Sequence, residues 1–323
     1  MYQLVIAGQK NNSIYIVEIV EKVVVEKVER RDKMDTLNVF DTYINDVKSN
    51  CTFSTVETYK NKFNTAMKYL GNIDAEEITV VFAQEFIDKL SKNYSTKTTR
   101  AIYDVVNAAF RLAVSKGSVH KNPFEACVVN QVVRYEPVIL SLEQTDTLLK
   151  TTNVNHSLYV PILIAIETGL RRSQVLALTW GDVNFSNSTI EVSKNILSAK
   201  KHIFTEGKEH QKRNVIMSDR LSETLLNIKN YRRSIGVAVG TGDYVCLTAS
   251  HLAMEPTYFN RLFRQLVLKC NEIPDNLRFH DLRWSYINNE VIKGTDPMTI
   301  ADKVGHKSCV FTMDYYYRNR KVA

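Results

Sequence analysis

Residues 158–172 read LYVPILIAIETGLRR, and this stretch decides how the second half of the chain folds. Residues 158–168 are almost wholly apolar, which predicts a buried helix rather than an amphipathic helix at the surface. Gly169 breaks that helix, and Arg171 and Arg172 come directly before the next one, which we expect over residues 173–180. A rigid turn of this kind can hold an arginine in a cleft, although an arginine pair after a turn is often only a solvated surface feature.

Around this stretch, the second half of the chain is mainly helical with a small β-region. Ser141 and Gln144 have the spacing of a capping box, which predicts a helix start. Glu206 and Gly207 form a turn, and the segments with strand character are residues 189–192, 201–204 and 213–217. The remainder reads as helix, apart from a short apolar stretch at residues 244–247.

The first half of the chain reads as four helices within residues 36–118. The third is expected over residues 79–90, and the fourth begins near Ser95. The apolar positions recur at helical spacing, so they are expected to face inward. These inward positions include Leu37, Phe40, Ile44, Val47, Val56, Tyr59, Phe63, Met67, Leu70, Ile102, Val105, Val106, Ala109, Phe110 and Ala113.

These patterns together predict a mainly α chain with a small β-sheet, an α+β class. Residues 1–35 read as a short β-rich segment, although a helix over residues 18–29 is an alternative. Residues 36–118 form a helical domain. Residues 119–138, with their Asn-Pro and Glu-Pro pairs, form a linker, and residues 139–323 form the larger domain.

The composition is that of a globular protein with a basic excess. Of 323 residues, 44% are hydrophobic and 24% are charged, and the net charge of +7 permits a nucleic-acid partner without requiring one. The longest apolar runs are far short of the ~20 residues that cross a bilayer, and we expect neither a signal peptide nor a membrane span. Five scattered cysteines without CxxC spacing argue against disulfides and indicate a reducing cytoplasm.

Further residues with chemical potential lie in the larger domain. His280 and Arg283 are three apart and share a helix face, Gly305 and His306 lie in a turn, and three tyrosines occupy residues 315–317. A guanidinium offers a planar fork of donors to phosphate oxygens, and an imidazole exchanges protons near neutral pH. A tyrosine hydroxyl becomes a useful nucleophile where cations stabilise the developing charge. A metal site at the two histidines is the alternative, but no carboxylate or cysteine stands at a ligand spacing.

In this order, the clusters resemble the tyrosine recombinase (phage integrase) family. The pieces are Thr168-Gly169-Leu170-Arg171, Gly207-Lys208, His280-Asp281-Leu282-Arg283, Gly305-His306 and the tyrosines of residues 315–317. Each piece is weak alone, but five in sequence order behind a helical domain make a specific pattern. The resemblance covers residues 36–318 and implies a helical, SAM-like core-binding domain followed by the tyrosine-recombinase catalytic domain.

The resemblance also implies catalytic roles for single residues. Arg171, Arg283 and His306 would stabilise the charge on the phosphate in the transition state. His280 would accept or relay the proton of the nucleophile, and Lys208 would protonate the leaving oxygen.

Two of the implied roles have alternatives. Loop length varies before residue 213, so Lys200, Lys201 and Lys212 stay open in place of Lys208. The pattern around Tyr316 favours it as the nucleophile, whereas a count of nine residues from His306 gives Tyr315, and Tyr317 is a weaker third choice.

The chain departs from the family pattern at several positions. Gln174 stands where an acidic residue is usual, and the bulky Trp284 and Tyr286 stand where small residues are usual. Only a short segment follows Tyr316, which puts the mode of assembly in question. None of these departures removes a catalytic group.

The activity implied is site-specific recombination, in which duplex DNA is cleaved and rejoined through a 3′-phosphotyrosyl intermediate without a cofactor. The element moved would be a phage or another mobile element, and residues 1–35 would be a vestige of an arm-binding domain. The alternatives are a Xer-like resolvase, a type I topoisomerase-like enzyme and an inactive DNA-binding regulator.

The resemblance also implies partners and a cellular place. The partners are double-stranded DNA at attachment sites, further copies of the chain in a homotetramer, and DNA-bending or directionality proteins, all in the cytoplasm of a bacterial or archaeal host. Basic side chains should neutralise DNA phosphates. Those we expect to do so are Lys60, Lys62, Lys97, Arg100, Lys200, Lys201 and Lys212.

Overall fold

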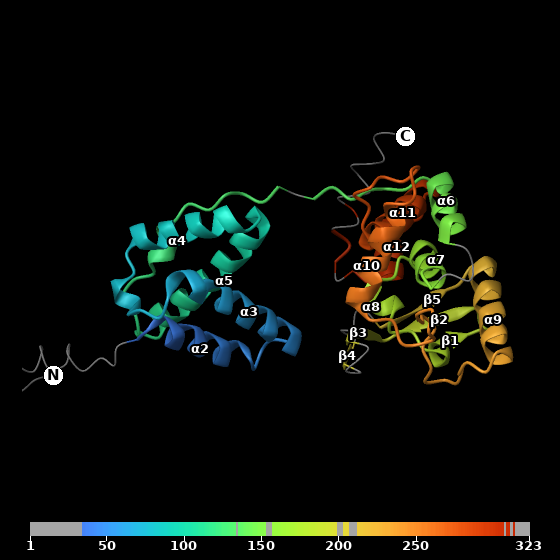
Figure 1. The fold of residues 1–323 in the computed structure, drawn as a ribbon, viewed down its shortest axis with the longest axis horizontal. Coiled ribbons are helices and arrows are strands. Elements are labelled where there is room, and N and C mark those ends of the chain that lie inside the picture. Colours follow the sequence, from blue (N-terminus) through green and yellow to red (C-terminus); the bar gives the residue numbers. More distant parts are fainter. Residues whose placement is uncertain are drawn as a thin grey trace, which may run out of the picture. The chain divides into compact units, whose positions relative to one another are not determined.

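The computed structural model describes residues 34–133, 135–152, 157–198, 203–206, 212–306, 308–310 and 313. These residues form two compact units, and the second begins at Tyr135 (Figure 1). The predicted β-rich segment lies almost wholly outside the described residues, as do Lys200, Lys201, Lys208 and the three tyrosines of residues 315–317.

The first unit is built from four helices, as the apolar spacing predicts. They are α2 (Thr36–Val47), α3 (Phe53–Leu70), α4 (Val80–Asn93) and α5 (Thr96–Ser115). A Thr, Ser or Asp side chain caps the start of each helix by accepting a backbone N–H. The six predicted inward positions of α5 are all buried, and Phe40 of α2 stacks on Phe63 of α3 at 4.1 Å between ring centroids. The prediction is wrong for Leu37 in the first turn of α2, which is exposed.

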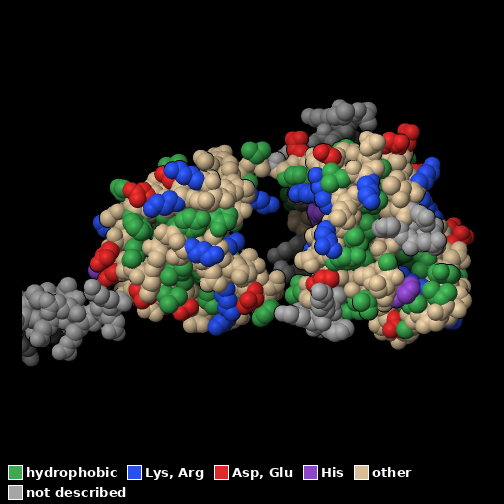
Figure 2. All heavy atoms as spheres, in the orientation of Figure 1, with side chains coloured by type: hydrophobic (Ala, Val, Ile, Leu, Met, Phe, Trp, Pro, Cys, Tyr) green, Lys and Arg blue, Asp and Glu red, His purple; other side chains and the backbone are tan. Residues whose placement is uncertain are grey.

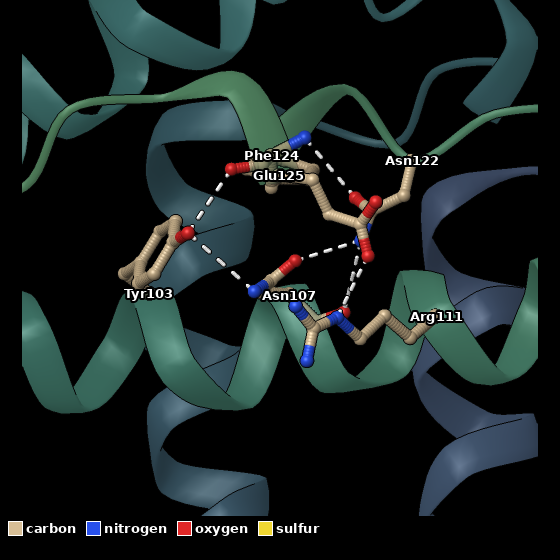
Figure 3. A network of polar contacts seen from close by, with 6 residues as sticks. All are labelled: Tyr103, Asn107, Arg111, Asn122, Phe124 and Glu125. Carbon is tan, nitrogen blue, oxygen red and sulfur yellow. Dashed lines mark hydrogen bonds and ion pairs between the residues drawn. The ribbon is translucent and has the colours of Figure 1, made fainter.

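The start of the predicted linker packs into the first unit instead of crossing between units. A 3₁₀ helix, η2 (Pro123–Ala126), follows Asn122, and the Phe124 side chain is fully buried. The Tyr103 hydroxyl donates to the Phe124 carbonyl at 3.1 Å, and the Asn122 side chain donates to the Asn107 side chain at 2.7 Å (Figure 3). These bonds tie η2 to α5, so the free connection between the units is shorter than residues 119–138.

The core of the second unit is built around the apolar stretch of residues 158–168. This stretch forms α7 (Tyr159–Thr168), in which nearly every side chain is buried, and α7 packs against α11 (Phe279–Ile292). Around them lie α6 (Leu142–Thr152), α9 (Asp219–Ser234), α10 (Pro256–Val267) and α12 (Pro297–Val304) (Figure 1). The predicted capping box is confirmed, since Ser141 and Gln144 exchange bonds of 3.0 and 3.1 Å. The helix predicted over residues 173–180 is wrong in length: α8 covers only Arg172–Val175.

Two small antiparallel sheets flank this helical core. The first has the order β1 (Val183–Asn184), β2 (Thr189–Val192), β5 (Arg213–Ile216), with Ile190 opposite Val215. The second pairs β3 (Lys194–Ser198) with β4 (Ile203–Glu206). Strand β3 was not predicted. The prediction of a mainly α chain with a small β part is confirmed, with the β part divided into two sheets.

Within the described residues, no helix combines the length and the apolar character that crossing a membrane requires.

Candidate active site

The predicted site residues gather around the C-terminal end of α12. The backbone N–H groups of Gly305 and His306 donate to Asp302 and Ala301, which is the pattern of a Schellman motif with Gly305 in the left-handed conformation. The next three carbonyls in the chain each accept a bond from an arginine instead. Arg213 binds the carbonyl of Lys303 at 2.7 Å, Arg283 that of Val304 at 2.7 Å and Arg171 that of Gly305 at 3.2 Å.

Arg171 is held in place by the turn that follows α7. Gly169 ends that helix at φ 65°, and the Arg171 backbone N–H donates to the Gln174 side chain at 3.1 Å. Gln174 is buried and so performs with a neutral amide the capping that an acidic residue would provide. Besides its bond to Gly305, the Arg171 guanidinium has a buried Nη1 with no hydrogen-bond partner among the described residues.

Arg283 connects three parts of the second unit. Its side chain is 2% exposed and lies on α11, one turn after His280. Its Nη1 donates to the Gly169 carbonyl at 2.7 Å, while its Nη2 donates to the Val304 carbonyl. The same guanidinium therefore fixes the end of α7 against the end of α12, and burial together with the charges of Arg171 and Arg213 lowers its pKa.

Arg213 is a further member of this cluster, and the sequence did not predict a role for it. Burial and the charge of Arg171 lower its pKa to about 10, which shows that it belongs to the same electrostatic group. Its only sequence signal was its position five residues after Lys208, at the first residue of a predicted strand.

The two histidines complete the group. Burial lowers the pKa of His306 to about 3, aided by the charges of Arg283, Arg171 and Arg213. The ring of His280 reaches solvent, and its pKa is also lowered, first by partial burial and then by Arg283 and Arg171. Both rings are therefore neutral at pH 7 in the absence of a bound anion, and each can donate and accept one hydrogen bond.

The depressed pKa of His306 predicts an acid-sensitive fold. Below its usual pKa near 6.5 the unfolded chain binds a proton that the folded chain refuses, so the free energy of unfolding falls as the pH drops from about 6.5 towards 3. Thermal melts across that range should show a smaller loss for His306→Asn than for the wild type. Equal losses in both proteins would contradict the shift.

The two buried carboxylates near the cluster are engaged by other side chains. Asp281 is buried but receives the Tyr135 hydroxyl at 2.7 Å and the backbone N–H of Arg278 at 2.9 Å. Glu290 is engaged by Lys293 at 3.1 Å and Lys303 at 2.6 Å. The site thus presents fixed positive charge and oriented donors, which suit an anion with several oxygens, such as a phosphate.

Gly169 is required by the backbone and by its neighbours. A Cβ at this position would lie 2.5 Å from the Tyr286 ring and 3.1 Å from Val304, and the φ of +65° disfavours any side chain. The bulky Tyr286 therefore packs where the glycine leaves room.

We expect Gly169→Ala to destabilise the second unit more than Gly294→Ala does. Left-handed strain costs about 1–2 kcal/mol at either position, and overpacking adds about 1–3 kcal/mol at Gly169 alone. Gly294 is the matched control, because it has a φ of +77° and open space around it. Denaturant unfolding measures both, and equal losses would show that Tyr286 moves aside without cost.

The structure brings four of the predicted catalytic residues together: Arg171, His280, Arg283 and His306. Lys208 and Tyr316 lie outside the described residues. The described part of the chain contains no group of three or more His, Cys, Asp or Glu side chains arranged to hold a metal.

The predicted DNA-contacting side chains differ in how far they are engaged within the protein. Lys60 pairs with Glu57 at 2.7 Å, and Arg100 pairs with Asp104 at 2.9 Å. Lys62 lies over the Tyr59 ring, while Lys97 and Lys212 are exposed. Figure 2 shows Lys and Arg side chains on both units, with acidic side chains among them.

Comparison with known proteins identifies the family. The profile of the phage integrase family matches residues 139–322, and that of the phage integrase SAM-like domain matches residues 35–132. The chain belongs to the phage integrase family. The predicted resemblance is thereby confirmed, and the arginine and histidine cluster lies within the part of the chain that the integrase profile covers.

Several curated proteins are similar to this chain. The transposase from transposon Tn916 of Enterococcus faecalis is 26% identical over 267 residues, covering 76% of this chain and 65% of the relative. The ICEBs1 integrase of Bacillus subtilis is 22% identical over 255 residues, covering 77% and 69%. The chain thus spans slightly less than two thirds of the length of the Tn916 transposase.

Solved structures of other integrases share the fold. The Tn1549 transposon integrase in complex with a circular intermediate DNA gives a TM-score of 0.75 at 20% identity, covering 90% of this chain and 99% of that one. A lambda integrase tetramer bound to a Holliday junction gives 0.68 at 16% identity, covering 92% and 88%.

Proposed function

We propose that this integrase is a site-specific tyrosine recombinase that integrates or excises a mobile element. The observation that carries the proposal is the gathering of Arg171, Arg283 and His306 at the end of α12, where the two guanidinium charges lower the pKa of His306. A scissile phosphodiester is the anion that such a cluster fits, and the Tn916 and ICEBs1 relatives are named as a transposase and an integrase.

In the proposed reaction the Tyr316 hydroxyl oxygen attacks the phosphorus in line. The Tyr316 oxygen–phosphorus bond forms, and the bond from phosphorus to the 5′ oxygen breaks. His280 takes the phenolic proton, and Lys208 gives a proton to the leaving 5′ oxygen. The product is a 3′-phosphotyrosyl link with a free 5′ hydroxyl, so rejoining to a new strand needs no ATP.

The arginines act on the charge that grows on the equatorial phosphate oxygens. Arg171 and Arg283 are already oriented by their bonds to backbone carbonyls, so little reorganisation accompanies the reaction. His306 follows directly on Gly305 and, as a neutral imidazole, donates a hydrogen bond to the same phosphate. No step in this scheme is assigned to a cofactor.

Binding and assembly follow the same proposal. DNA affinity should fall steeply with salt, because Lys and Arg side chains such as Lys97 and Lys212 release counterions from the phosphates. The active form would be a homotetramer on paired attachment sites, with DNA-bending or directionality proteins as partners, in the cytoplasm of the host. The lambda integrase tetramer on a Holliday junction supports this assembly.

Covalent trapping tests the proposed function. Nicked duplexes that tile the DNA flanking the coding region would be incubated with the full chain, so that the small released strand diffuses away and rejoining fails. A denaturation-resistant protein–DNA band, together with strand exchange between two paired sites, is the expected result. Binding without a covalent band would favour the inactive regulator, and nicking without exchange would favour the topoisomerase-like enzyme.

A further inference from the structure

Arg213 reaches from the edge of a sheet to the turn that carries His306. It is the first residue of β5, and its Nε donates to the Lys303 carbonyl at 2.7 Å. Its Nη1 lies 2.6 Å from the point that a Cβ on Gly305 would occupy. A glycine at 305 therefore allows the guanidinium to lie directly against the turn, at the residue that immediately precedes His306.

The last turn of α12 is held from two sides at the same residue. The Lys303 ammonium pairs with the buried Glu290 of α11 at 2.6 Å, while the Lys303 carbonyl accepts the bond from Arg213 of β5. Since α12 has eight residues, these contacts fix much of its end. A shift of this turn would displace His306 and the carbonyls that orient Arg171 and Arg283.

Arg213 also lies between two segments of the chain that carry proposed catalytic residues. It lies five residues after Lys208, the proposed acid for the leaving oxygen, and its contact is with the helix that precedes the tyrosine cluster. Strand β5 is itself held by β2, where Arg213 stands opposite Val192. Arg213 thus links the sheet formed by β2 and β5 directly to the turn that carries His306.

We propose that Arg213 is a positioning residue of the active site, which holds the Gly305–His306 turn so that His306 meets the scissile phosphate. This inference rests on the proposed function, because it assigns to Arg213 a role in DNA cleavage through His306. It acts on the reaction through the turn and does not touch the phosphate.

The test compares Arg213→Gln with Arg232→Gln in the full chain. Arg232 is the matched control, since its half-buried guanidinium also donates to a backbone carbonyl, that of Val245, at 2.7 Å. Single-turnover cleavage of the nicked duplex and DNA affinity would be measured for both. We expect Arg213→Gln to lower the cleavage rate constant by about 100-fold with affinity changed by less than about 5-fold, and Arg232→Gln to leave the rate within about 2-fold.

A double-mutant cycle with His306→Asn separates positioning from general loosening. If Arg213 works through His306, adding Arg213→Gln to His306→Asn should cost less than about 3-fold, because coupled residues are not additive. The same roughly 100-fold loss in both backgrounds would overturn the proposal. Arg213→Lys, which retains the aliphatic stem and the charge but not the planar fork, replaces Arg213→Gln in the cycle if that variant does not fold.

The wild type separates this inference from the function on which it rests. Cleavage by the wild type together with undiminished cleavage by Arg213→Gln would refute the positioning role alone. Absence of cleavage by the wild type on every flanking duplex would refute the proposed function and the positioning role with it.

Discussion

Tyr316→Phe is expected to abolish the covalent protein–DNA product while leaving DNA binding within about 2-fold of the wild type. The phenolic oxygen is the atom that forms the new bond to phosphorus in the proposed reaction, and phenylalanine has no oxygen with which to form it. The substitution removes a single oxygen atom, so its effect on the fold should be small. A labelled nicked duplex followed by denaturing electrophoresis measures the product, and a mobility shift measures binding.

The neighbouring tyrosines provide the controls for this experiment. Tyr315→Phe and Tyr317→Phe carry the same chemical change one residue away, and both should retain a covalent band. A band that persists in Tyr316→Phe and disappears in Tyr315→Phe would move the nucleophile to Tyr315, in agreement with the count of nine residues from His306. A band in all three variants would mean that the nucleophile is not in this cluster.

Arg171→Gln is expected to lower the single-turnover cleavage rate by about 10²–10³-fold, the usual cost of losing one fixed donor at a developing charge. Its Nη1 is buried with no described partner, and its charge lowers the pKa of His306, His280 and Arg213. Those shifts place the Arg171 guanidinium at the centre of the cluster.

Arg172→Gln is the matched control for this prediction. Arg172 is adjacent in the chain and equally half-buried, but its charge is not among those that lower the pKa of either histidine. Its variant should cleave within about 3-fold of the wild type, with a similar melting temperature to Arg171→Gln. Equal rate losses in the two variants would indicate that the turn, and not the Arg171 guanidinium, is what the reaction needs.

The helices and most site residues could be predicted because their signals are local. The inward positions of α5 recur at helical spacing, and the burial of α7 follows from its almost wholly apolar sequence. Gly169 ends that helix as a glycine in the left-handed conformation should. The order of Arg171, His280, Arg283 and His306 along the chain then matched the family.

The remaining features depend on contacts between distant segments. Strand β3 contains Lys194 and Asn195, whose polar side chains weaken the strand pattern, and it exists because β4 pairs with it. The role of Phe124 in the first unit could not be predicted from the proline-rich composition, since it depends on Tyr103. Arg213 was missed because its partner, the Lys303 carbonyl, is 90 residues away.

The two bonds that Arg283 donates to the Gly169 and Val304 carbonyls have a consequence for genetics. A replacement there leaves two buried carbonyls unsatisfied as well as removing a guanidinium, and a loss of even 1–2 kcal/mol changes cellular abundance several-fold. Strains with changes at Arg283 should therefore contain little of the protein at all. Strains with changes at Arg171 should accumulate normal amounts of an inactive protein. Only a loss of recombination in the Arg171 strains therefore reports on the chemistry of the site.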